Sequence, residues 1–127
     1  MMRPTLLLLS GDEQIAKLIA TVANATWRIA QYLETHAIHR ILAEPHVKLV
    51  ILDDEAIEEP ERGRLLTQIR RRIPSASLLY VAAGHDEQNE KRARTNGAHY
   101  YVSKPLSLDR FGHVVQSFMR LHEAGVS

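Results

Sequence analysis

Three consecutive acidic residues, Asp53, Asp54 and Glu55, directly follow the apolar run at residues 49–52. An unbroken apolar run of strand length is typical of a central parallel strand that helices cover on both faces. In a sheet of parallel strands, the functional crevice lies beyond the carboxyl ends of the strands. Carboxylate oxygens are also the ligands that Mg²⁺ prefers in proteins. We therefore expect Asp53 to stand in that crevice, where the chemistry of such domains is usually done.

Strand patterns and helix patterns alternate along the rest of the chain. Short apolar runs predict strands at residues 5–9, 48–52 and 77–83, an alternating pattern predicts one at 27–32, and a fifth at 98–103 ends at Lys104-Pro105. A capping box formed by Ser10 and Glu13 predicts the start of a first helix, which ends near residue 24. Apolar residues at helical spacing predict three more helices, at about residues 35–42 and 65–73 and after Ser107. A polar helix is predicted at about residues 87–95, because Asp86 suits a helix cap and Asn96-Gly97 suits a helix end. This alternation predicts a single α/β domain over residues 1–127, with a mainly parallel sheet and helices on both faces.

The composition limits the kinds of molecule that the protein is expected to bind and the cellular compartment in which it is expected to lie. Cysteine is absent, which excludes disulfides and thiolate metal sites and fits a reducing compartment. The formal net charge is +1, so the chain as a whole has no electrostatic pull toward nucleic acid or a membrane. Its apolar runs are too short to span a bilayer, and we find no signal peptide at the N-terminus. We expect a cytoplasmic protein that binds neither nucleic acid nor membrane.

Two motifs and their spacing resemble the receiver domains of bacterial two-component response regulators. The motifs are KLVILD, which ends at Asp53, and DEQNEKRARTNGAHYYVSKPLSLDRF, which runs from residue 86 to 111. The resemblance implies that Asp53 is the position that accepts a phosphoryl group and that Lys104 contacts that group. It implies that Tyr101 is an aromatic switch residue that rotates inward in the active state. It also implies a flavodoxin-like fold with strand order 2-1-3-4-5.

The chain departs from the pattern of that family in two regions, the first of which directly follows the first strand. Receivers place two acids directly after the first strand to hold a divalent cation, and here these positions are Ser10 and Gly11. A serine hydroxyl is a weak ligand and glycine has no side chain, so we expect a direct ion pair between Asp53 and Lys104 in place of a metal site. We expect no cofactor. Any Mg²⁺ site would be weak and would use Asp12, Asp53 and Glu55.

The second departure is Ala82, which stands where receivers carry serine or threonine. In the family that hydroxyl bonds to the phosphoryl group and makes room for the aromatic switch, and a methyl group cannot form the bond. We therefore expect poor coupling between Asp53 and Tyr101. The leading hypothesis is an atypical signalling receiver that is not an enzyme and that acts as a protein–protein interaction module.

Two other functions remain open at this point. One is a working phospho-switch, phosphorylated on Asp53 by a histidine kinase, in which Asp12, Asp54 or Glu55 replaces the missing metal ligands. The other is a small enzyme or nucleotide-binding domain of flavodoxin-like shape, which the absence of a glycine-rich phosphate loop disfavours.

The expected partner is a signalling protein, either a histidine kinase or an output domain. In receivers, the face built from the fourth helix, fifth strand and fifth helix commonly binds partners. Here that face would carry Lys91, Arg94, Tyr100 and Arg110, which suits an acidic partner or a second copy of the chain.

Overall fold

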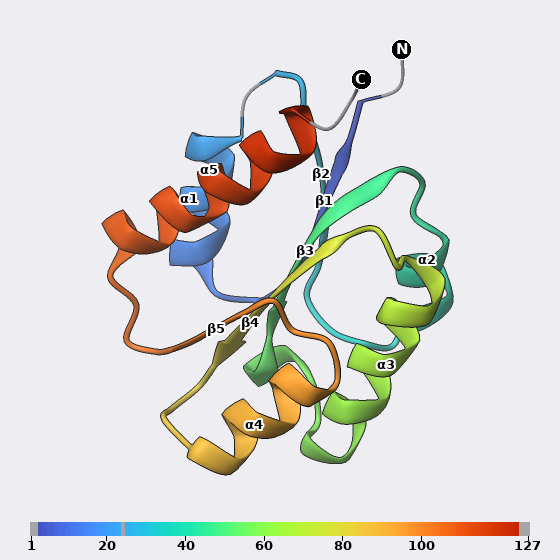
Figure 1. Ribbon diagram of the computed structural model, residues 1–127, viewed down its shortest axis with the longest axis vertical. Coiled ribbons are helices and arrows are strands. Elements are labelled where there is room, and N and C mark those ends of the chain that lie inside the picture. The colour runs from blue at the N-terminus through green and yellow to red at the C-terminus, as the bar shows by residue number, and fades with distance from the viewer. Residues whose placement is uncertain (1–2, 24, 125–127) are drawn as a thin grey trace.

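A computed structural model describes residues 3–23 and 25–124 of the chain. Its centre is one sheet of five parallel strands in the order β2-β1-β3-β4-β5 (Figure 1). The strand order predicted from the family resemblance is therefore confirmed. The strands are β1 (Thr5–Leu9), β2 (Arg28–Tyr32), β3 (Val47–Asp53), β4 (Ser77–Ala82) and β5 (Tyr100–Ser103).

Within the residues that the structure describes, five α-helices cover the two faces of the sheet. They are α1 (Glu13–Val22), α2 (Ile38–Ala43), α3 (Arg62–Arg72), α4 (Glu87–Thr95) and α5 (Leu108–Ala124). Helices α1 and α5 lie together on one face, and α2, α3 and α4 lie on the other (Figure 1). Two short 3₁₀ helices, η1 (Asp54–Ala56) and η2 (Glu59–Glu61), connect β3 to α3. No helix within the described residues is long and apolar enough to cross a membrane.

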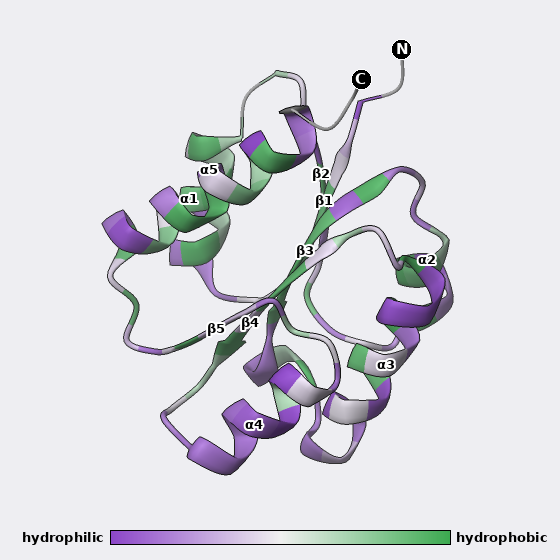
Figure 2. Cartoon of the chain, viewed as in Figure 1, coloured by the Kyte–Doolittle hydropathy of each residue, from purple (hydrophilic) through white to green (hydrophobic). Residues whose placement is uncertain are grey.

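The central strands are apolar on both faces because each face is covered by helices. Successive side chains of a strand point to opposite faces. In β1, Leu6 and Leu8 accordingly enter the core under α1 and α5, whereas Leu7 and Leu9 enter the core under α2, α3 and α4. All four are fully buried. Figure 2 shows the resulting pattern, in which apolar strands lie between helices whose outer faces are hydrophilic.

The predicted elements all form, and the differences lie at their ends. Helix α4 has the predicted bounds, because Asp86 caps its first turn by accepting from the backbone N–H groups of Gln88 and Asn89. Helix α2 begins at Ile38 and not near residue 35, and its N-cap Ala37 makes no side-chain capping bond. The predicted capping box at the start of α1 is wrong: Asp12 is the N-cap, and it accepts from the N–H groups of Gln14 and Ile15.

Candidate functional site

The sheet topology brings the ends of β1, β3 and β5 to one edge. Ser10 follows β1, Asp53 is the last residue of β3, and Lys104 follows β5. The backbone N–H of Lys104 donates to the carbonyl oxygen of Ala82 at 2.8 Å, which anchors the residue beside the end of β4. Because the strands are parallel, all these carboxyl ends meet on the same side of the sheet. The chain order thus places one carboxylate, one hydroxyl and one ammonium group together.

Asp53 is buried, and protein groups bond to both of its carboxylate oxygens. Its Oδ2 accepts a hydrogen bond from Ser10 Oγ at 2.7 Å and from Lys104 Nζ at 3.0 Å. Its Oδ1 accepts from the backbone N–H of Glu55 at 3.1 Å. Hydrogen bonds to a charged acceptor are the stronger kind, and here they compensate the burial of the carboxylate. Ser10 therefore bonds directly to Asp53 and does not cap α1.

Lys104 lies at the centre of three carboxylates. Its Nζ is 3.0 Å from Asp53 Oδ2, 3.0 Å from Glu55 Oε1 and 3.1 Å from Asp12 Oδ2. An ammonium group has three N–H donors, so each of these acids can accept one. Burial lowers the pKa of Lys104, but the hydrogen bonds to Asp53, Glu55 and Asp12 outweigh it and raise the pKa above its ordinary value. The expected Asp53–Lys104 ion pair is present, and Asp12 and Glu55, which the expectation did not include, bond to the same ammonium.

Asp12 has two structural roles at once. Its Oδ1 caps α1, at 2.9 Å from the N–H of Gln14 and 3.3 Å from that of Ile15, while Oδ2 faces Lys104. Partial burial raises the pKa of Asp12, but the bond from Lys104 and the two backbone bonds lower it below its ordinary value. Residue 12 thus fixes the start of the helix and places a negative charge at the site.

Asp54 lies on the other side of the strand end from Asp53. Its Oδ1 accepts from the backbone N–H of Ala83 at 2.8 Å. Its Oδ2 accepts from the hydroxyl of Tyr80 at 3.2 Å and from Asn89 Nδ2 at 3.4 Å. Adjacent residues at a strand end point in opposite directions, which explains the separation. Of the three acids considered as substitute ligands, Asp12 and Glu55 reach the site and Asp54 does not.

The site opens into a small surface cavity of about 320 Å³. The acids Asp12, Asp53 and Glu55 all line it, yet each directs an oxygen toward Lys104. In the part of the chain that the structure describes, no group of three histidine, cysteine, aspartate or glutamate residues is arranged to hold a metal ion. In this arrangement the ammonium of Lys104 occupies the position between the three carboxylates.

The predicted switch residues lie close to each other on neighbouring strands. Ala82 is fully buried at the end of β4. Tyr101 is buried on β5, and its ring stacks on that of Tyr80, with the ring centroids 5.5 Å apart and the planes 7° from parallel. The Tyr101 hydroxyl accepts a hydrogen bond from Asn89 Nδ2 at 3.2 Å. Tyr101 therefore points inward.

Sequence reasoning missed Tyr80 and Asn89 as neighbours of Tyr101. A signal for Asn89 exists in the sequence: it lies four residues before Ala93, the apolar residue of α4, and residues at this spacing share one helix face. Both residues are buried. Tyr80 sits opposite Tyr101 in the register of β4 and β5, which only the pairing of the strands reveals.

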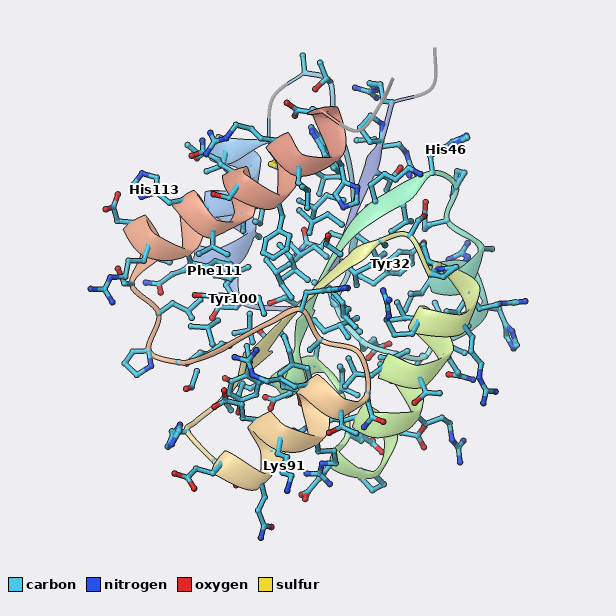
Figure 3. All side chains as sticks on the ribbon, viewed as in Figure 1. Tyr32, His46, Lys91, Tyr100, Phe111 and His113 are labelled. Atoms are coloured by element: carbon cyan, nitrogen blue, oxygen red, sulfur yellow. The ribbon has the colours of Figure 1, made fainter. Side chains whose placement is uncertain are left out.

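The residues predicted to form a partner-binding face are accessible to different degrees. Lys91 and Arg110 are exposed, and Tyr100 is half-buried. Arg94 is exposed but forms an ion pair with Glu90 at 3.0 Å, one turn earlier in α4. Figure 3 shows Lys91 projecting from the outer side of α4, whereas Phe111 lies on the inner side of α5.

Comparisons with known proteins identify the fold. No family model matches the sequence, and no curated protein matches it. A two-component response regulator from Clostridium difficile has a TM-score of 0.76 at 21% identity, covering 93% of this chain and 97% of its own. A response regulator from Thermotoga maritima has a TM-score of 0.74 at 20% identity, with coverage of 93% and 98%. An orphan response regulator from H. pylori has a TM-score of 0.75 at 15% identity, with coverage of 92% and 97%. The chain therefore has the flavodoxin-like fold of response-regulator receiver domains.

Proposed function

We propose that this chain is the receiver domain of a two-component or phosphorelay signalling protein, that its phosphoacceptor position is Asp53, and that it acts as a protein–protein interaction module. The observation that carries this proposal is the arrangement around Lys104, whose ammonium bonds to Asp53, Glu55 and Asp12. The receiver fold supports the class of protein, and the arrangement around Lys104 supports the atypical mode of action.

Phosphoryl transfer to Asp53 would meet two obstacles in this arrangement. The transfer depends mostly on positioning and on neutralising charge around the phosphoryl group. Three carboxylates against one ammonium leave the site with excess negative charge, which repels an anionic donor. In addition, the Ser10 hydroxyl and the Lys104 ammonium both bond to Asp53 Oδ2, so this oxygen could attack a donor only after it lost a partner. The ion-paired state is thus the resting state of the domain.

Relay of a signal from Asp53 would also be weak. The methyl group of Ala82 offers no hydrogen bond to a phosphoryl group on the neighbouring strand. If Asp53 accepts phosphoryl groups poorly and its coupling to Tyr101 is weak, a phosphorylation cycle cannot control the domain efficiently. A binding surface that does not depend on phosphorylation suits such a domain better. We therefore assign it no enzymatic activity and a cytoplasmic location, as its composition suggests.

The partner in this proposal is a signalling protein, either a histidine kinase or an output domain. The surface that would contact it, or a second copy of the chain, carries Lys91, Arg94, Tyr100 and Arg110. Sedimentation of Lys91→Glu and Arg110→Glu variants tests the homodimer directly. The matched control is Lys17→Glu, because Lys17 is an exposed lysine on α1, across the sheet from α4. A wild-type dimer lost only in the first two variants supports this face, and an unchanged dimer contradicts it.

Incubation with acetyl phosphate and Mg²⁺, followed by intact mass measurement, tests the proposal as a whole. We expect no stoichiometric addition of a phosphoryl group to the wild-type chain. The control is Asp53→Asn, which removes the acceptor while keeping the shape of the side chain. Stoichiometric labelling of the wild type that disappears in Asp53→Asn would overturn the proposal.

That outcome would favour the second candidate function, a working phospho-switch. One observation supports this alternative: the carboxylates of Asp12 and Glu55 both lie beside Asp53, so they could become ligands if Lys104 moved away. Asp54 is not part of this alternative as we propose it, because its two oxygens bond to Ala83, Tyr80 and Asn89.

A further inference from the structure

A buried polar network lies beside the candidate site and is not used by the function proposed above. Asp54 is at its centre and is almost completely buried. Its carboxylate bonds to the backbone of Ala83 and to the side chains of Tyr80 and Asn89. Arg62 Nη2 donates to the Asp54 carbonyl oxygen at 2.9 Å, and its Nη1 lies 3.9 Å from the carboxylate. A buried carboxylate with this many partners is held firmly in one position.

Asn89 connects Asp54 to Tyr101. Its side-chain Nδ2 carries two N–H donors, one directed at Asp54 Oδ2 and one at the Tyr101 hydroxyl. The residue is buried on the inner face of α4, whose start is capped by Asp86. Asn89 is therefore a fixed bridge between the loop after β3 and the tip of the tyrosine on β5.

Tyr80 holds the same tyrosine from the side. The rings of Tyr80 and Tyr101 are stacked, and the Tyr80 hydroxyl donates to Asp54 Oδ2. Tyr101 thus has a ring partner and a hydroxyl partner, and both are bonded to Asp54. Outward rotation of Tyr101 would uncover the Tyr80 ring and leave a buried Asn89 N–H without its acceptor, and both changes are unfavourable.

The chemistry of the two tyrosines agrees with this geometry. Burial raises the pKa of Tyr101, the bond from Asn89 opposes the shift, and the negative charges of Asp54 and Glu90 add to it. Burial and the charge of Asp54 also raise the pKa of Tyr80. Both hydroxyls therefore keep their protons at neutral pH.

Asp53 does not take part in this network. Among the described residues, its side chain bonds to Ser10, Lys104 and the backbone of Glu55. The side chains of Asp53 and Asp54 thus belong to two separate sets of contacts, although the residues are adjacent in the chain. A change at Asp53 has no hydrogen-bonded route to the Tyr101 hydroxyl through these contacts.

We propose that Asp54 and Asn89 are positioning residues that hold Tyr101 inward whatever the state of Asp53. This inference deepens the proposed function and rests on it. It explains how the face around β5 keeps a single conformation to which a partner can bind. In this proposal Asp54, and not Asp53, determines the orientation of the Tyr101 side chain. The conformation of the partner-binding face is then fixed by the fold.

The test uses the full chain labelled with 3-fluorotyrosine and observed by ¹⁹F NMR. The chain has four tyrosines, so single Tyr→Phe variants assign the signals. We expect the Tyr101 signal of the wild type to show almost no solvent-isotope shift. In Asn89→Ala it should gain such a shift and move toward its position in the urea-unfolded chain. Gln88→Ala is the matched control, because Gln88 is exposed on the same helix.

A second variant covers the case in which Asn89→Ala fails to fold. Asp54→Asn keeps the shape of the carboxylate and changes its bonds to Tyr80 and Asn89, so it should also release Tyr101. If Tyr101 stays unchanged in both folded variants, the inference is wrong. Movement of the Tyr101 signal in Asp53→Asn also overturns it.

Acetyl phosphate with Mg²⁺ separates this inference from the proposed function. Labelling of Asp53 with an unmoved Tyr101 signal would overturn the proposed resting state and support the independent positioning of Tyr101. Labelling accompanied by movement of Tyr101 would overturn both. No labelling, with Tyr101 released in Asn89→Ala, would support both.

Discussion

Replacement of Lys104 by methionine tests whether one ammonium holds three acids together. Methionine keeps the apolar stem of the side chain and removes the charge. Only 16% of the Lys104 side chain is exposed, and its partner Asp53 is 2% exposed, so the substitution leaves a buried carboxylate without a cation. Loss of one partner from a buried ion pair typically costs about 3–5 kcal/mol. Asp12 and Glu55 are 26% and 57% exposed, so solvent screens their share. We expect the free energy of unfolding at pH 7 to fall by about 2–4 kcal/mol.

Asp53→Asn gives the comparison that makes this result decisive. In that variant Lys104 keeps Asp12 and Glu55 as partners, and the repulsion among the three acids is reduced. We expect a change of no more than about 1 kcal/mol, in the range of an ordinary hydrogen bond. The unequal cost of the two substitutions follows from the three-acid arrangement. A single ion pair between Asp53 and Lys104 would make the two costs similar.

Urea unfolding at pH 7 and again near pH 3 measures both effects. The folded-state pKa of Asp12 lies below its ordinary value of 3.8, so its contribution is present above that pH and is lost as the pH falls through the lowered value. Lys104→Met removes this contribution, so the gap between the wild type and the variant should narrow in acid. Lys91→Met is the control, because Lys91 is exposed. Equal losses in Lys104→Met and Asp53→Asn at pH 7 would refute the reasoning.

Three further predictions concern other parts of the fold. Partial desolvation of the imidazole lowers the pKa of His99 and of His122, and the charge of Arg70 adds to the shift of the former and the charges of Lys48 and His99 to that of the latter. As the pH falls, the histidines of the unfolded chain therefore bind protons before those of the folded chain, and the free energy of unfolding should decrease below the ordinary histidine pKa of 6.5. Urea midpoints measured between neutral and mildly acid pH check this, and His122→Gln should make the midpoint depend less on pH. Gly97→Ala should destabilise by about 1–3 kcal/mol in thermal unfolding, because φ is +114° and the new Cβ would lie 2.4 Å from Arg70 Cγ. Gly84→Ala, whose Cβ would meet nothing within 4 Å, should be neutral. Asp12→Ala should cost about 1 kcal/mol in urea through loss of the α1 cap, and the same cost for the exposed Glu13→Ala would contradict this role.

Much of the fold is readable from the sequence because its signals are local. Apolar runs bounded by polar residues mark the central strands β1, β3 and β4, since strands covered on both faces need apolar side chains along their length. The edge strands β2 and β5 are only partly buried, and their sequences carry a weaker signal. Helix α4 was predicted with its observed bounds, because Asp86 and the Asn96–Gly97 pair mark its ends. The predicted start of α1 was wrong, because Ser10, Asp12 and Glu13 all suit a helix start. Which of them caps the helix depends on the contacts that each side chain makes in the folded chain.

The candidate site also has features that the sequence predicts and features that it does not. That Asp53 and Lys104 meet follows from the order of the strands, since both stand at carboxyl ends of one parallel sheet. Local sequence does not say that Glu55 and Asp12 also reach Lys104, or that Asp54 turns away to bind Tyr80 and Asn89. These contacts join residues far apart in the chain, and they depend on helix placement and side-chain direction. The sequence by itself therefore determined which chemical groups gather at this edge, and only tertiary packing decided which acid bonds to which partner.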